Sequence, residues 1–145
     1  MPETDPAGSA ALLFCLNLNR ATARLVRRLD HRLSALHGLG LNDFMILHYA
    51  DQAPQGKIRR SDLAAQLGLT ASAVTRLLIP LEKIGLVSRL ADPRDARVSY
   101  VVLTPGGKER LTDALRSATD TSQDLVGQIP AGELEALSAL LDSLA

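Results

Sequence analysis

Apolar residues recur along much of the chain at the three- and four-residue spacing of an α-helix. Residues 9–37 form the first such segment, with Gly8 or Ser9 as its cap and Gly38 just beyond its end. Residues 10–19 are apolar nearly all round, so another surface must cover this part of the helix. The remaining turns place one apolar row on a single face, comprising Leu18, Leu25, Leu29, Leu33 and Leu36.

The same spacing predicts five more helices, and two short stretches around a turn predict a β-hairpin. The hairpin strands are residues 86–90 and 98–103, joined by the turn-forming segment 91–96. Residues 57–60 are compatible with a further short strand. The helices span residues 43–51, 62–67, 71–84, 105–126 and 133–144, with Asn42, Ser61, Thr70 and Thr104 as the caps of the first four.

Residues 62–78 have the pattern of a helix-turn-helix. Gly68 permits the positive φ of a tight turn, and the second helix leaves its N-terminal part exposed. That part enters the major groove of DNA in such motifs, where Arg76 can bond a guanine edge or a phosphate. An ordinary helical hairpin with a solvated face is the alternative. The candidate DNA contacts are Ser61, Thr70, Ser72, Ala73, Thr75 and Arg76.

The hairpin that follows favours DNA binding over that alternative. A charged ribbon tip beside a recognition helix is a wing, and its arginines suit the narrow minor groove. Asp95 is interpreted as a brace that orients Arg97, and a tip charged only for solubility is the alternative. The candidate residues of the wing are Arg94, Asp95 and Arg97.

Residues 68–78, 81–87 and 92–107 resemble the MarR family of bacterial regulators. The resemblance is firm over residues 40–107 and weaker over the flanking helices. It implies a triangular homodimer with interlocked terminal helices and two winged lobes on a pseudo-palindromic DNA site. It also makes Arg97 the wing arginine, and it assigns to the recognition helix Ser72, Thr75 and Arg76.

Pro80 departs from the family pattern, in which a polar helix former usually stands at this position. Proline removes a backbone donor and clashes with the preceding turn, so we expect it to kink the recognition helix. The DNA-reading end of the helix lies before Pro80, and altered geometry rather than lost binding is expected.

These patterns predict one mainly α domain over residues 1–145. Its winged helix-turn-helix lobe spans residues 41–104, and its dimerisation helices span residues 9–38 and 105–145. Apolar faces on both terminal segments exceed what a monomer of this size needs to bury, which favours a second copy as partner.

Charge strengthens the case for DNA only when its distribution is considered. The net charge is zero at pH 7, yet residues 57–97 hold eight basic and four acidic side chains, whereas residues 105–145 hold three and seven. A basic middle is typical of a localised phosphate-binding face, although chance clustering is an alternative. Aromatic residues make up 3% of the chain, which argues against single-stranded nucleic acid.

The single cysteine excludes an internal disulfide and raises the question of redox sensing. Cys15 lies near the position at which hydroperoxide-sensing relatives of the resembled family keep a reactive thiol. Its neighbours Phe14 and Leu16 are apolar and its helix contains no tyrosine, so we expect a buried structural thiol. A regulator released from DNA by oxidation of Cys15 is the alternative.

Four arginines of the first helix share a face, which is usually a solvated stripe. The family resemblance implies a cleft for anionic aromatic ligands, and the candidate effector-binding residues are Arg20, Arg24 and Arg27. The histidines are scattered without the spacing of a metal site, so no metal and no cofactor are expected. The three histidines are His31, His37 and His48.

The function predicted from the sequence is a homodimeric, sequence-specific regulator of transcription that binds double-stranded DNA. We expect a repressor relieved by a small effector. No phosphate loop or catalytic set stands in the chain, so an enzyme is not expected. Neither a signal peptide nor a spanning segment is evident, which favours a cytoplasmic protein without a membrane partner. A winged-helix protein-interaction module without DNA binding is the alternative from another class.

Overall fold

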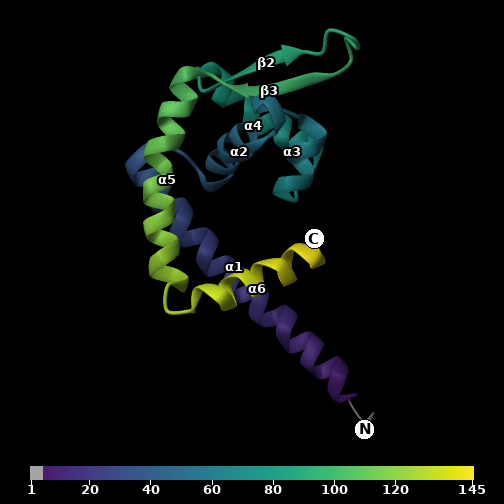
Figure 1. Ribbon diagram of the computed structural model, residues 1–145, viewed down its shortest axis with the longest axis vertical. Coiled ribbons are helices and arrows are strands. Elements are labelled where there is room, and N and C mark those ends of the chain that lie inside the picture. The colour runs from purple at the N-terminus through teal and green to yellow at the C-terminus, as the bar shows by residue number, and fades with distance from the viewer. Residues whose placement is uncertain (1–4) are drawn as a thin grey trace.

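Six α-helices and a three-stranded sheet make up residues 5–145, the part of the chain that the computed structural model describes (Figure 1). The predicted mainly helical winged fold is confirmed, and only residues 1–4 of the expected domain lie outside the described residues. The helices are α1 Pro6–His37, α2 Leu41–Gln52, α3 Arg60–Leu67, α4 Ala71–Lys83, α5 Pro105–Val126 and α6 Ala131–Leu144. The strands are β1 Lys57–Arg59, β2 Val87–Ala91 and β3 Ser99–Leu103, and a 3₁₀ turn at Pro54–Gly56 precedes β1.

Hydrogen-bonding side chains close the starts of two helices as the sequence predicts. The backbone N–H of Ala73 donates to Thr70 Oγ1 at 3.2 Å, and that of Gly107 donates to Thr104 Oγ1 at 3.0 Å. Gly68 takes the positive φ of 66° that the helix-turn-helix requires. These signals act within a few residues of each other, which explains why they could be recognised from the sequence.

Other predicted helix starts were wrong. Helix α1 begins at Pro6 and not after Gly8 or Ser9, because Asp5 accepts a hydrogen bond from the backbone of the first turn. Helix α2 begins at Leu41, so Asn42 is not its cap. Helix α3 begins at Arg60, so Ser61 is not its cap, and α6 begins at Ala131. Helix α4 ends at Lys83, and the hairpin strands are Val87–Ala91 and Ser99–Leu103.

The earlier start of α2 results from a contact with α1. The backbone N–H of Leu41 donates to Asp30 Oδ1 at 2.8 Å, and that of Gly40 donates to Asp43 Oδ2 at 2.9 Å. Asp30 lies eleven residues before Leu41, so one carboxylate of the long first helix fixes where the second begins.

Pro80 lies on the exposed side of α4, and the helix continues through it to Lys83. The proline therefore does not end the recognition helix. Whether it bends the helix axis, as the missing backbone donor leads us to expect, stays a prediction.

The sheet places β3 in the centre with β1 and β2 antiparallel on either side. Arg59 pairs with Tyr100, and Ala91 pairs with Ser99 where the hairpin leaves the body. Figure 1 shows the β2–β3 ribbon above α3 and α4, with the loop that joins its strands projecting beyond the helices. The ribbon therefore has the position of a wing relative to the helix-turn-helix.

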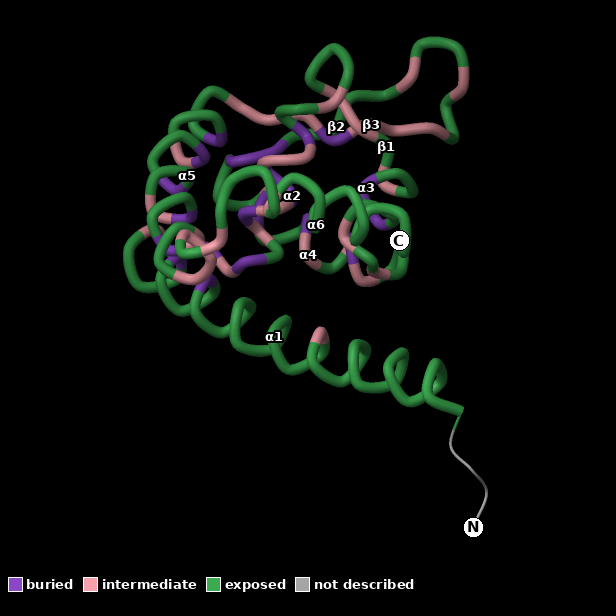
Figure 2. The backbone as a smooth tube through the Cα atoms, turned by 60° about the horizontal axis from the view of Figure 1, so that its bottom comes forward, coloured by how far each residue is buried: buried purple, intermediate pink, exposed green. Residues whose placement is uncertain are grey.

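The hydrophobic core lies within the winged lobe and at its contact with α1 and α5. Leu29 and Leu33 are the buried residues of α1, whereas Leu25 and Leu36 of the same apolar row are 40% and 53% exposed. Figure 2 shows that the N-terminal half of α1 is exposed along nearly all its length. The fully buried large side chains are Leu33, Leu39, Ile46, Leu47, Leu63, Leu78, Val74 and Val101.

Among the described residues no single helix is both long and apolar enough to cross a membrane. Helices α3 and α4 taken together are the one pair there that is long and apolar enough, and they are bent by 104° at their turn.

Gly107, in the first turn of α5, lies at a point of close backbone approach to the winged lobe. A Cβ at this position would overlap the carbonyl oxygen of Leu86, whereas one at Gly106 would meet its nearest atoms at 3.7 and 3.8 Å. We expect Gly107→Ala to lower the free energy of unfolding by about 1–3 kcal/mol, the usual cost of overpacking. Gly106→Ala is the matched control and is expected to be neutral or slightly stabilising. Urea denaturation of both variants measures the difference, and equal stabilities would contradict the close approach.

Candidate nucleic-acid interface

The N-terminal part of α4 is the exposed end of the helix-turn-helix. Ser72 and Arg76 are exposed there, and Thr75 is half-buried. Thr75 Oγ1 donates to the carbonyl oxygen of Ala71 at 3.0 Å and accepts from the guanidinium of Arg60 at 3.3 Å. Arg76 is thus free to reach a partner, while the Thr75 hydroxyl is already held within the protein.

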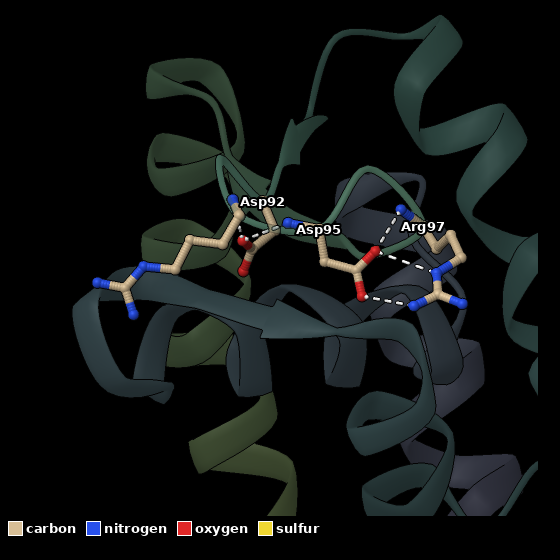
Figure 3. Close-up of polar contacts among 4 residues, drawn as sticks. Asp92, Asp95 and Arg97 are labelled. Atoms are coloured by element: carbon tan, nitrogen blue, oxygen red, sulfur yellow. Dashed lines mark hydrogen bonds and ion pairs between the residues drawn. The ribbon is translucent and has the colours of Figure 1, made fainter.

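The wing tip is organised by Asp95, which acts as the brace predicted for Arg97 (Figure 3). Asp95 Oδ1 accepts from the backbone N–H of Arg97 at 3.0 Å and from its Nε at 3.2 Å. A second guanidinium nitrogen of Arg97 lies 3.4 Å from Asp95 Oδ2. The side chain of Arg97 is nevertheless 90% exposed, so its guanidinium is oriented and remains accessible.

A second carboxylate, which the sequence reasoning missed, closes the turn between the strands. Asp92 Oδ1 accepts from the backbone N–H of Arg94 at 2.7 Å and from that of Asp95 at 3.2 Å. The Tyr100 hydroxyl donates to Asp92 Oδ2 at 3.0 Å. The signal was present in the sequence, because an aspartate at the start of a loop commonly bonds the backbone two residues on.

The two wing carboxylates predict how the wing responds to acid. The backbone N–H of Arg94 and the Tyr100 hydroxyl hold the pKa of Asp92 below its ordinary 3.8, and the Arg97 side chain does the same for the pKa of Asp95. Because folding lowers the pKa values of both carboxyls, their hydrogen bonds are fully formed above pH 3.8. They are lost as the pH falls through the lowered pKa values of the folded protein. We expect NMR amide shifts of Arg94 and Arg97 to stay constant down to that pH. A wing titration step above it would contradict the hydrogen bonding described.

The structure brings the recognition helix and the wing together around one pocket of about 380 Å³. Among the sequence-predicted residues Ser61, Ser72, Thr75 and Arg97 line it, whereas Arg76 and Arg94 lie outside. Arg59 and Arg60, which the sequence analysis included in the basic segment 57–97 without assigning them to the site, also line the pocket. The full lining is Arg59, Arg60, Ser61, Ala71, Ser72, Thr75, Arg97, Val98 and Ser99.

The candidate effector arginines lie in a separate groove of about 800 Å³ between the middle of α1 and the C-terminal helices. Arg20, Arg24 and Arg27 line one side of it, as their shared helical face predicts. The opposite side is apolar. It is formed by Leu125, Val126 and Leu141.

The prediction of a buried Cys15 was wrong for the single chain, in which this thiol is exposed. It lies among exposed apolar side chains of α1, including Phe14 and Leu16. The physical reason is that no other part of residues 5–145 covers this half of the helix. Within the described residues the structure shows no cluster of His, Cys, Asp or Glu suited to a metal, and His37 instead bonds the Ser117 hydroxyl at 2.7 Å.

An exposed recognition helix beside an arginine-tipped ribbon defines a winged-helix protein of the kind that binds duplex DNA. Residues 39–99 match the model of the MarR family. Over this region the chain is similar to the MarR family, whose members are transcriptional regulators and not enzymes.

Relatives and solved structures agree with this family. YdgJ, an uncharacterized HTH-type transcriptional regulator of Bacillus subtilis, is 32% identical over 96 residues, which are 66% of this chain and 56% of YdgJ. The chain thus spans just over half the length of that relative. YcgE, another such protein of B. subtilis, is 27% identical over 135 residues, or 88% of this chain and 86% of YcgE. A mutant MarR of E. coli complexed with operator DNA superposes with a TM-score of 0.77 at 27% identity, covering 97% of this chain and 99% of that one.

Proposed function

We propose that this chain is a homodimeric, sequence-specific regulator that binds double-stranded DNA in the cytoplasm and acts as a repressor. The observation that carries the proposal is the pairing of an exposed recognition-helix end with the braced, 90% exposed Arg97 of the wing. The recognition helix enters the major groove of a half-site, and the wing arginine enters the neighbouring minor groove.

The homodimer is supported by apolar side chains that the single chain leaves in solvent. Most of the large exposed hydrophobic residues are on α1 and α6. Leu12, Leu13 and Leu16 are 61%, 59% and 58% exposed on α1, and Leu144 is 63% exposed on α6. A second copy that covers these helices would place two winged lobes side by side, as a pseudo-palindromic operator requires.

The effector part of the proposal rests on the groove lined by Arg20, Arg24 and Arg27. Guanidinium groups on one side and apolar side chains on the other suit a small anion with an apolar or aromatic body. Binding there would act at the joint between the terminal helices, and a change in their packing would alter the spacing of the two lobes.

Selection of binding sites from a library of randomised duplexes tests the proposal directly. We expect the purified full-length chain to enrich a two-fold symmetric motif whose half-sites lie about one helical turn apart. A footprint of the enriched duplex would show protection of both half-sites. If no motif were enriched and the few duplexes retained by the protein did not depend on salt concentration, DNA binding would be contradicted. A protein-interaction module would then be favoured.

A further inference from the structure

Three arginines converge on the pocket between α3, α4 and the wing, and no carboxylate of residues 5–145 lines it. Arg59 ends β1, Arg60 begins α3, and Arg97 follows the wing tip. Arg59 and Arg60 are adjacent in the sequence, and Arg97 is brought beside them because β1 pairs with β3 in the sheet. Hydroxyl groups of Ser61, Ser72 and Thr75 complete the polar lining.

Arg60 is the central member of this group because it is half-buried and makes no ion pair. The ion pairs within residues 5–145 join Arg89 to Glu82 and Arg97 to Asp95. The hydrogen bond to Thr75 Oγ1, at 3.3 Å, uses one of the five donors of the Arg60 guanidinium. A partly desolvated guanidinium with donors to spare is stabilised by an anionic ligand that accepts from it.

We propose that this pocket binds one backbone phosphate of duplex DNA, held by Arg60 together with the hydroxyls of Ser61 and Ser72. The inference rests on the proposed function and adds a DNA contact whose main residue, Arg60, lies outside the recognition helix and the wing tip. A phosphodiester oxyanion matches the planar fork of arginine, and its negative charge would offset part of the positive charge that Arg59 and Arg60 bring to the pocket. The N-terminus of α4 lies at the same pocket and adds its favourable dipole.

Position in the fold favours a phosphate of DNA over a free anion. The pocket lies between the helix proposed for the major groove and the ribbon proposed for the minor groove. The strand that separates the two grooves of a half-site must pass between these elements, so its phosphates face the pocket. Arg60 would then position the DNA strand and the Thr75 hydroxyl at once.

The dependence of DNA affinity on salt measures this contact. The full-length protein and its Arg60→Gln variant are titrated into two labelled duplexes over a KCl series, one of arbitrary sequence and one carrying the selected motif. We expect the slope of log affinity against log salt to fall by about one unit for each lobe in Arg60→Gln, equally on both duplexes. Arg60→Lys keeps the charge and is expected to keep the wild-type slope.

Arg116→Gln is the charge-matched control, because Arg116 is exposed on α5 and does not line the pocket. Equal slopes in Arg60→Gln and the control would overturn the phosphate site. A changed preference for the selected motif without a changed slope would also overturn it, because Arg60 would then act only by holding Thr75. If the wild-type protein bound no duplex at all, the proposed function would fail, which is a distinguishable result.

Calorimetry with inorganic phosphate separates the two sources of the oxyanion. We expect no binding of millimolar inorganic phosphate to the DNA-free protein, because one free ion gains none of the contacts that recognition helix and wing make to a duplex. Saturable binding that Arg60→Gln abolishes would overturn the assignment to DNA and would make the pocket a site for a free oxyanion.

Discussion

An Arg97→Ala variant is expected to bind its selected duplex about tenfold to a hundredfold more weakly for each winged lobe, the effect of losing about 1–3 kcal/mol of groove contact. The side chain of Arg97 is 90% exposed, and within residues 5–145 it bonds only Asp95. Its removal should therefore leave the fold unchanged, so the loss in affinity reports the contact with DNA. Fluorescence anisotropy with the selected duplex measures it, and thermal unfolding checks the fold.

Arg116→Ala provides the comparison for this substitution, since it removes the same charge from an exposed site on α5. We expect that control to lose little affinity beyond the general effect of one positive charge. Undiminished affinity of Arg97→Ala for the selected duplex would refute the role of the wing arginine. A loss equal to that of the control would show that the charge of Arg97 acts at long range and not in a groove.

The parts of the fold that could be predicted from the sequence are those fixed by neighbouring residues. Thr70 and Thr104 bond backbone groups three residues on, and the positive φ of Gly68 is a local requirement of its turn. Asn42 and Ser61 have equally good capping chemistry but are not caps. The start of α2 depends on Asp30 of the preceding helix, and α3 starts where β1 ends. Contacts between elements decided these cases, and a single sequence does not display them.

The candidate site divides in the same way. The wing arginine and its brace lie two residues apart and were identified together, whereas the contribution of Arg60 was not. Arg60 contacts Thr75 across fifteen residues, and its pocket exists only because β1 joins the sheet beside β3. The cluster of basic residues from Lys57 to Arg60 was a visible signal of this role. Its meaning required the sheet order, which places that cluster beside the recognition helix.

The prediction for Cys15 failed for a reason that concerns the whole molecule. A cysteine surrounded in sequence by Phe14 and Leu16 is expected to be buried, and in the single chain it is exposed together with them. The local inference about an apolar environment was sound, but the burying surface is absent from residues 5–145. This makes the exposed half of α1 the strongest physical reason to propose a second copy.

A Leu16→Asp variant is therefore expected to be monomeric and to bind its selected duplex at least about a hundredfold more weakly. Leu16 is 58% exposed in the single chain, so aspartate should not disturb the core of the lobe. In the proposed homodimer the same position is buried, and an unpaired carboxylate there is strongly unfavourable. Separated lobes would engage half-sites one at a time and would lose the effective concentration that joins them, which is commonly worth about a hundredfold or more.

Sedimentation velocity and anisotropy on the same samples test both parts of this expectation. Asn17→Asp adds the same charge at the adjacent, already polar and exposed position, and it should remain dimeric with nearly unchanged affinity. A Leu16→Asp protein that sediments as a dimer would contradict the proposed use of this face. If the variant became monomeric yet retained full affinity, a single lobe would suffice for binding. The apolar half of α1 would then serve an association that DNA recognition does not need.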